Sequence, residues 1–334
     1  MLIPVRLDAQ SYDIVLEAGA LHEAGRWLNL DRKVLIVTDD GVPAAYAETV
    51  ASQCKEATIV TLPQGEASKN FANFQHLLSC MLKASLTRHD CVVAVGGGVV
   101  GDLSGFAASC YMRGIDFYNV PTTLLSQVDS SIGGKTAIDF EGVKNIVGAF
   151  YQPRRVLIDP DTLKTLDKRQ LHAGLAESIK MAMTSDAALF ELIEQSTDLY
   201  ADLPEIIRRS LLIKRDVVEQ DPKEAGLRRI LNFGHTVGHA IESFHAGKLL
   251  HGECVAAGMI PFCAPTLRPR LKALLQAYDL PTAAKGSTEE LLPYILHDKK
   301  READTVAIVF VDEIGSFRMT NVPTHQIPSY LEAQ

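Results

Sequence analysis

The feature that most restricts the fold of this chain is the alternation of strand-like and helix-like segments in its first half. Apolar, β-branched runs occur at residues 34–37, 58–62, 92–95, 117–120 and 156–158. Segments of helical length separate most of them, and this alternation is typical of a parallel, doubly wound sheet. An earlier pair of runs, at residues 3–7 and 12–16, predicts a hairpin around Asp8-Ala9-Gln10-Ser11.

The pattern changes after about Pro160. Helical periodicity then dominates, and the helices we expect lie at residues 170–184, 186–197, 204–219, 229–244 and 253–260. A late hairpin is expected near residues 305–310 and 317–319. The sequence therefore predicts an α/β, Rossmann-like domain at 1–158 and a mainly α-helical domain at 159–334. Because open α/β sheets bind ligands beyond the carboxyl ends of their strands, a site in the cleft between the domains is expected.

Composition excludes several classes of protein. Hydrophobic residues make up 47% and charged residues 22%, as in globular proteins, and the net charge of −8 argues against nucleic acid or an anionic membrane as the partner. No run approaches the length of a membrane span, and the N-terminus does not resemble a signal peptide. The six scattered cysteines form no C-x-x-C pair, which indicates reduced thiols and a cytoplasmic protein.

A glycine cluster follows the run at 92–95, as Gly96-Gly97-Gly98. Such a turn at the start of a helix lets backbone N–H groups approach a pyrophosphate, although it differs from the G-x-G-x-x-G fingerprint, and a tight structural turn is the alternative. Asp39 follows the run at 34–37, where a carboxylate accepts hydrogen bonds from ribose hydroxyls or caps a helix.

Polar residues are dense between Arg113 and Asn145. Within this segment Lys135 follows two glycines, so nothing crowds its ammonium, and an oxyanion or a phosphate suits such a site. Solvated loop lysines are the alternative for any one residue.

Histidines gather in the second half. His235 and His239 are four residues apart and share one face of a helix, and His251 follows. Spacing alone favours His235 and His239 as joint metal ligands, together with His251 or a carboxylate. Glu177 lies in a segment of small residues where an unpaired carboxylate is costly to bury, and Lys180 shares its helix face.

Together these segments resemble the 3-dehydroquinate synthase family of sugar phosphate cyclases. The resemblance is carried by GGGVVGDLSGFAASCYMRG, VPTTLLSQVDSSIGGKTAID, KNIVGAFYQP, GLAESIKMA, RRILNFGHTVGHAIE and LLHGECVAAGM, which run almost continuously over residues 96–259. It implies bound NAD, a Zn²⁺ or Co²⁺ ion, a small sugar acid phosphate as substrate and a homodimer.

The resemblance also implies residue roles. The metal ligands are Glu177, His235 and His251, so His239 becomes an acid/base group on the substrate side, and Glu224 matches a second acid/base carboxylate. The cofactor contacts are Asp39, Glu66, Lys69, Gly97, Gly98, Val99, Asp102, Thr122, Thr123, Lys144 and Thr165. The substrate contacts are Asp129, Lys135, Asn145, Lys180, Lys214, Arg228, Asn232, Lys299 and Arg113, the last reaching a neighbouring subunit.

The implied reaction belongs to the shikimate pathway of aromatic amino acid biosynthesis. It converts 3-deoxy-D-arabino-heptulosonate 7-phosphate to 3-dehydroquinate and phosphate by transient oxidation, β-elimination, reduction and aldol closure. The chain departs from the family after Met259, where Pro261 and Pro265 shorten a helical region by about a dozen residues. Three alternative functions remain compatible with the sequence: a polyol dehydrogenase, a noncatalytic binding paralogue and a cyclase for another sugar phosphate.

Overall fold

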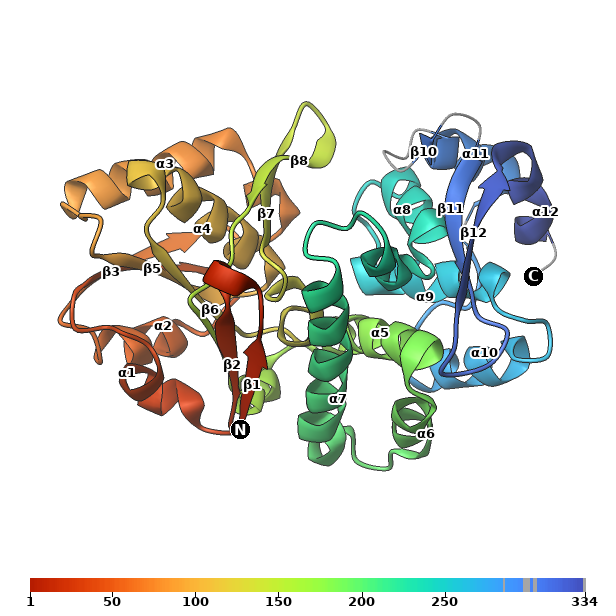
Figure 1. Cartoon of the computed structure of the whole chain (residues 1–334), viewed down its shortest axis with the longest axis horizontal. Helices are drawn as coiled ribbons and strands as arrows, with labels where there is room; N and C mark the ends of the chain where they lie inside the picture. Colours follow the sequence, from red (N-terminus) through yellow and green to blue (C-terminus); the bar gives the residue numbers. More distant parts are fainter. Residues whose placement is uncertain (285, 297–300, 303–304, 333–334) are drawn as a thin grey trace. The chain divides into compact units, whose positions relative to one another are not determined.

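A computed structural model describes residues 1–284, 286–296, 301–302 and 305–332 (Figure 1). The chain divides into two compact units, Met1–Leu166 and Asp167–Gln334. The sequence prediction places the division at residue 158, whereas in the structure the short 3₁₀ segment Pro160–Thr165 belongs to the first unit. Among the described residues, no helix has both the length and the apolar character needed to cross a membrane.

Within residues 1–166, all of which are described, seven strands form one sheet in the order β1-β2-β9-β6-β5-β3-β4. The strands are β1 (Leu2–Val5), β2 (Tyr12–Leu16), β3 (Lys33–Asp39), β4 (Glu56–Leu62), β5 (Cys91–Gly96), β6 (Asp116–Pro121) and β9 (Arg155–Ile158). Only β1 is antiparallel to its neighbour; the other pairs are parallel. The predicted doubly wound sheet and the early hairpin are confirmed.

Helices cover both faces of this sheet because side chains alternate along each strand. Leu35 and Val37 of β3 pack with helices α3 (Phe71–Lys83) and α4 (Gly98–Cys110). Val34 and Ile36 pack on the other face with α1 (Ala24–Trp27) and α2 (Ala44–Ala51). Every residue of β5 is buried, as expected for the centre of a parallel sheet.

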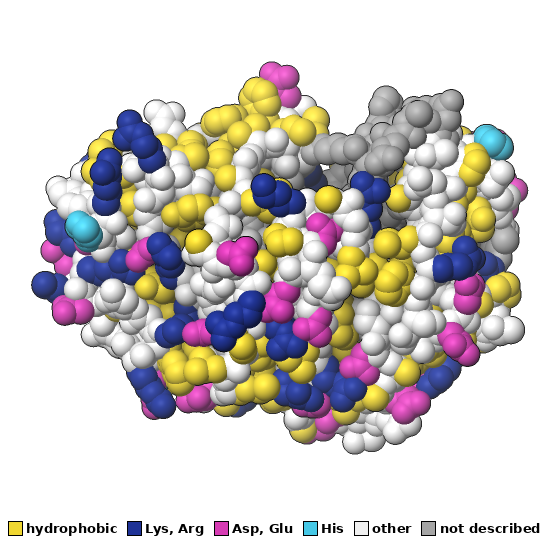
Figure 2. Space-filling model, viewed as in Figure 1, with side chains coloured by type: hydrophobic (Ala, Val, Ile, Leu, Met, Phe, Trp, Pro, Cys, Tyr) yellow, Lys and Arg dark blue, Asp and Glu magenta, His cyan; other side chains and the backbone are white. Residues whose placement is uncertain are grey.

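A second hairpin, β7 (Lys135–Phe140) and β8 (Val143–Phe150), was not predicted from the sequence. Its base packs on α4, and it leaves apolar side chains in solvent. These are Phe140, Val143, Ile146 and Phe150, and they gather on the hairpin at the top of the space-filling view (Figure 2).

The second unit is mainly helical, as predicted. Its helices are α5 (Lys168–Ser185), α6 (Ala187–Gln195), α7 (Leu199–Gln220), α8 (His235–Phe244), α9 (His251–Met259), α10 (Arg268–Ala277), α11 (Thr288–Leu296) and α12 (Ile327–Glu332). Strands β10 (Arg301–Glu302), β11 (Thr305–Phe310) and β12 (Arg318–Pro323) form an antiparallel sheet that contains the predicted late hairpin.

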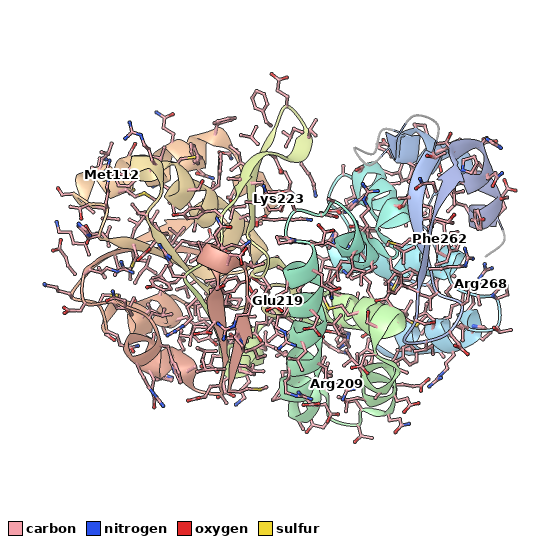
Figure 3. All side chains as sticks on the ribbon, viewed as in Figure 1. Met112, Arg209, Glu219, Lys223, Phe262 and Arg268 are labelled. Atoms are coloured by element: carbon pink, nitrogen blue, oxygen red, sulfur yellow. The ribbon has the colours of Figure 1, made fainter. Side chains whose placement is uncertain are left out.

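Helix α9 ends at Met259, just before the predicted break at Pro261, and a 3₁₀ turn over Ile260–Phe262 follows. Phe262 packs edge-on against Phe310 of β11, with 5.6 Å between the ring centroids (Figure 3). The early end of the helix is therefore accommodated by packing against the small sheet.

The prediction of one helix over residues 229–244 is wrong. Residues Leu227–Asn232 form a 3₁₀ segment, and α8 begins only at His235 after Gly234, whose φ is +77°. A Cβ at Gly234 would lie 2.8 Å from the carbonyl oxygen of Val255. Close contact with α9 and a left-handed backbone therefore require glycine here, and they divide the segment in two.

Candidate active site

Several predicted cofactor residues lie at the carboxyl edge of the sheet. Gly97 is the N-cap of α4 and directly follows β5. Thr122 directly follows β6, and its N–H donates to the carbonyl of Gly96, the last residue of β5, at 3.0 Å. A Cβ on Gly97 would lie 3.1 Å from Cγ2 of Thr123, and one on Gly98 would lie 3.0 Å from Oγ of Ser130. Because no side chain caps α4, its first N–H groups are available to an anion. This glycine turn fits a dinucleotide pyrophosphate.

Asp39 ends β3, the strand next to β5. Burial raises the pKa of its carboxyl, although hydrogen bonds from backbone N–H groups, including Gly41 at 2.9 Å, oppose the shift. Thr165 lies in the segment after β9, and its hydroxyl is 2.9 Å from the hydroxyl of Tyr46 on α2. Val99 lies in the first turn of α4.

A buried lysine joins the next group of predicted residues. Lys69 Nζ donates to Asp102 Oδ2 at 2.7 Å and to Asn145 Oδ1, and it lies 3.5 Å from Glu66 Oε1. Burial raises the pKa of Asp102 to about 6, because it outweighs the opposing charge and hydrogen bond of Lys69. The structure therefore brings three predicted cofactor residues together with Asn145, a predicted substrate residue.

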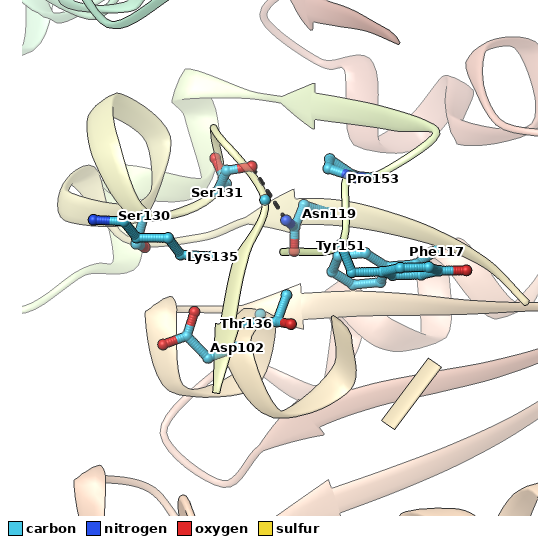
Figure 4. Close-up of a pocket in the computed structure, with 11 residues that line it drawn as sticks. Asp102, Phe117, Asn119, Ser130, Ser131, Lys135, Thr136, Tyr151 and Pro153 are labelled. Atoms are coloured by element: carbon cyan, nitrogen blue, oxygen red, sulfur yellow. Dashed lines mark hydrogen bonds between the residues drawn. The ribbon is translucent and has the colours of Figure 1, made fainter. Parts of the chain in front are cut away.

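A small pocket lies beside this network (Figure 4). Its lining includes Asp102, Asn119, Ser130 and Lys135, and the Asn119 side chain donates to the Ser131 carbonyl at 3.3 Å. Lys135 is exposed at the start of β7. The pocket has a volume of only about 10 Å³, room for about one water molecule, so it does not itself hold a sugar phosphate.

The remaining predicted residues of the first unit are more dispersed. Asp129 lies in the π-helical turn Ser126–Ser130, which follows β6. Lys144 is exposed on β8. Arg113 is exposed at the end of α4, in a turn where its φ is +70°, and it lines an open surface pocket with Arg88 and His89. The structure does not bring Arg113 to the glycine turn of its own unit.

In the second unit, Glu177 and Lys180 are one turn apart on α5 and almost inaccessible to solvent. Lys180 Nζ donates to Glu177 Oε2, which confirms the shared helix face. Burial alone would raise the pKa of Glu177, but the charge of Lys180 and the neighbouring His251 imidazole outweigh it and lower the pKa to about 2. The second oxygen, Oε1, is buried without a hydrogen-bond partner among the described residues.

Two histidines face that oxygen. His235 Nε2 lies 3.6 Å and His251 Nε2 lies 3.5 Å from Glu177 Oε1. The other nitrogen of each ring forms a hydrogen bond. His235 Nδ1 is 3.2 Å from the Phe233 carbonyl oxygen, and His251 Nδ1 is 3.1 Å from Glu242 Oε2. Burial opposes protonation of His251, but Glu177 and Glu242 outweigh it and raise the pKa of this imidazole to about 10.

This arrangement fits a divalent ion. Ligand atoms about 2.0–2.1 Å from a tetrahedral Zn²⁺ ion lie roughly 3.4 Å from each other, close to the two distances to Glu177 Oε1. A cation there would also satisfy the buried oxygen. The three imidazoles of His235, His239 and His251 also lie close enough together to hold an ion, so His239 is the alternative third ligand.

His239 nevertheless lies at the cluster, with its ring centroid 5.2 Å from that of His235 and 5.8 Å from that of His251. It is partly exposed.

Further predicted substrate residues come from neighbouring elements. Lys214 is buried on α7, which packs on α5. Arg228 is buried and donates through Nη1 to the Pro222 carbonyl at 2.8 Å, and the Asn232 amide donates to Glu224 Oε1 at 2.8 Å. Glu224 has a φ of +60° in the turn after α7. Lys299, predicted to contact substrate, lies outside the described residues.

Sequence reasoning missed one group in this site, Glu242. Its signal was its position seven residues after His235, which places both side chains on one face of α8.

Fold and site thus define the class of NAD- and metal-dependent enzymes built from an α/β unit and a helical unit. Family models described as 3-dehydroquinate synthase N-terminal and C-terminal match residues 59–173 and 174–301. A 3-dehydroquinate synthase of Enterococcus faecalis is 42% identical over 355 aligned positions, which cover 100% of this chain and 99% of that protein. The chain belongs to the 3-dehydroquinate synthase family.

Solved structures of related cyclases agree with this assignment. A 2-epi-5-epi-valiolone synthase from Streptomyces hygroscopicus subsp. jinggangensis, with NAD⁺ and Zn²⁺ bound, is 28% identical with a TM-score of 0.90 and 98% coverage of both chains. A 2-deoxy-scyllo-inosose synthase complexed with carbaglucose-6-phosphate, NAD⁺ and Co²⁺ has a TM-score of 0.89, 24% identity and full coverage of both chains. At that identity the second likeness concerns the fold alone.

Proposed function

We propose that this enzyme converts 3-deoxy-D-arabino-heptulosonate 7-phosphate to 3-dehydroquinate and phosphate, with NAD and one Zn²⁺ or Co²⁺ ion. The observation that carries the proposal is the buried Oε1 of Glu177, which has no hydrogen-bond partner among the described residues and faces Nε2 of His235 and His251. Full-length relatives named 3-dehydroquinate synthase support the choice of reaction. The reaction belongs to the shikimate pathway of aromatic amino acid biosynthesis.

The residues divide the work by their chemistry. When bound, NAD supplies reversible hydride acceptance and the ion polarises a substrate hydroxyl. Glu177, His235 and His251 would hold the ion, and the glycine turn at Gly97 and Gly98 would hold the pyrophosphate of NAD.

The chain's own cations account for the substrate's two anionic groups. Lys180, Lys214 and Arg228 are buried in the helical unit, where low solvent exposure strengthens their attraction for carboxylate and phosphate. A plain polyol dehydrogenase leaves these three charges unused. We propose that His239 moves a proton at an imidazole nitrogen, since it lies beside the ligand histidines and keeps access to solvent.

The decisive experiment incubates the enzyme with the heptulosonate phosphate, a catalytic amount of NAD⁺ and Zn²⁺ or Co²⁺. Phosphate and dehydroquinate should form in equal amounts without net NADH. Accumulating NADH would identify a dehydrogenase, and turnover of another sugar phosphate alone would identify a sister cyclase.

Three variants and one control test the ligand set. His251→Ala should lose bound metal and turnover, whereas His245→Ala is the matched control because that ring packs on Phe244, outside the cluster. His239→Ala should keep its metal and lose turnover. Metal loss in His239→Ala with retention in Glu177→Gln would instead assign the ion to the three histidines.

We also propose a homodimer. The exposed apolar side chains of the β7–β8 hairpin support an interaction between copies, because apolar groups that cluster on a surface favour association. Sedimentation of the wild type and of Ile146→Lys should show a dimer and a weakened dimer, respectively. A cytoplasmic location is proposed because all six cysteines are free thiols.

A further inference from the structure

Glu242 contacts a predicted metal ligand without facing the ion position itself. It lies on α8, and its Oε2 is 3.1 Å from Nδ1 of His251 at the start of α9. Its side chain is 12% exposed, so the carboxylate is largely removed from water. One face of α8 therefore supplies His235 to the metal cluster and, two turns later, the partner of His251.

The hydrogen bond decides which nitrogen of His251 is available. A carboxylate at Nδ1 keeps a proton on that atom, so Nε2, 3.5 Å from Glu177 Oε1, is the nitrogen that would give up its proton to bind an ion. In metal sites such an outer partner fixes the ring orientation and makes the imidazole a stronger ligand. His235 obtains the same orientation from a backbone carbonyl, that of Phe233.

Glu242 is not needed to begin helix α9. The N-terminal cap of α9 is provided by Glu253, which accepts from the Leu250 N–H at 2.8 Å and is held by a two-pronged contact with Arg169. The interaction between Glu242 and His251 is therefore additional to the structural contacts that place the helix.

We propose that Glu242 is a positioning residue that fixes the ligating tautomer of His251 and thereby strengthens divalent metal binding. The inference rests on the metal site proposed above. It predicts that Glu242 acts on the affinity for the ion, even in the absence of substrate and NAD.

The test measures the Zn²⁺ dissociation constant of the full chain by competition with a chromophoric chelator, and records the visible spectrum of the Co²⁺ form. Glu242→Ala should bind Zn²⁺ about 10–100-fold more weakly and alter the Co²⁺ absorption. Glu242→Gln should show a smaller loss, because an amide oxygen still accepts from Nδ1 but carries no charge. Glu194→Gln is the control, since that carboxylate pairs with Arg270 at 2.6 Å, away from the histidines.

Zn²⁺ affinity of Glu242→Ala within twofold of the wild type would overturn the inference. If that variant does not fold, the same criterion applies to Glu242→Gln. His251→Ala separates the two proposals, because metal retention in that variant refutes the metal site. Metal loss in His251→Ala with unchanged affinity in the Glu242 variants refutes only the role of Glu242.

Discussion

Replacing Glu177 by Gln tests the electrostatics of the site most directly. The side chains of Glu177 and Lys180 are 0% and 1% exposed, so the substitution leaves a buried ammonium without its carboxylate. Breaking such a pair costs about 3–5 kcal/mol. We expect Glu177→Gln to destabilise the metal-free helical unit by about 3–5 kcal/mol.

A double-mutant cycle separates this charge effect from packing. Lys180→Met should cost less than Glu177→Gln, because His251 remains beside the carboxylate at 3.5 Å. Adding Lys180→Met to Glu177→Gln removes the uncompensated ammonium and should restore most of the lost stability. The coupling energy should therefore amount to several kcal/mol.

Hydrogen exchange of the α5 amides measures this stability locally, which suits a chain of two units. In the wild type, Zn²⁺ at about 100 times its dissociation constant should raise the free energy of opening measured at these amides by about 2.7 kcal/mol. In the variants, Zn²⁺ should leave that free energy unchanged. A loss below about 1 kcal/mol in Glu177→Gln, or a double variant no more stable than Glu177→Gln, would refute the reasoning.

Three further predictions concern packing and pH. Gly258→Ala should lower both the thermal stability and the Zn²⁺ affinity, because the added Cβ would lie 2.1 Å from the Gly234 carbonyl oxygen and push α8 away from α9. An unchanged Zn²⁺ affinity would show that metal binding does not depend on the close contact of these two helices. Asp186 caps α6 and accepts two hydrogen bonds from Arg209 (labelled in Figure 3), which together outweigh burial and lower its pKa. Its stabilisation is present above the ordinary pKa and is lost as pH falls through the native value, so Asp186→Asn should cost about 1–2 kcal/mol in neutral urea unfolding and nothing in acid. Burial raises the pKa of Asp102 from 3.8 to about 6, so its contribution to stability is full below pH 3.8 and lost as pH rises through about 6. A carboxyl NMR titration should find this midpoint, and a value near 3.8 would contradict it.

The sequence predicted the sheet because its signal is local. Each buried strand is a run of β-branched residues, and β5 is buried throughout, so five runs were located within a few residues of their true ends. The β7–β8 hairpin was not predicted because its strands carry glycine and charged residues among the apolar ones, so neither reads as a clear strand. In the structure Glu141 and Gly142 of its turn both adopt positive φ, as a favoured two-residue hairpin turn requires, but of the two only the glycine could have indicated this in the sequence.

The proposed metal site was harder to predict because its residues come from different helices. Spacing identified His235 and His239 as a pair on one face of a helix, yet Glu177 comes from α5 and His251 from α9. No local periodicity connects such positions, so the resemblance to a family was needed to select them. The structure supplies the physical reason for preferring Glu177, namely an oxygen close to two ring nitrogens and otherwise without a partner.

Glycines allow helices α5, α8 and α9 to pack closely against one another. A Cβ on Gly252 would lie 1.8 Å from the Ala173 carbonyl oxygen of α5, and one on Gly238 would lie 3.1 Å from the Cys254 carbonyl oxygen of α9. Helices α5, α8 and α9 can approach this closely only because those positions are glycine, and larger residues would separate Glu177 from the histidines. The ligand geometry is therefore encoded as much by glycines in the helix contacts as by the ligands, and a search for metal-binding residue types alone would miss that half of the site.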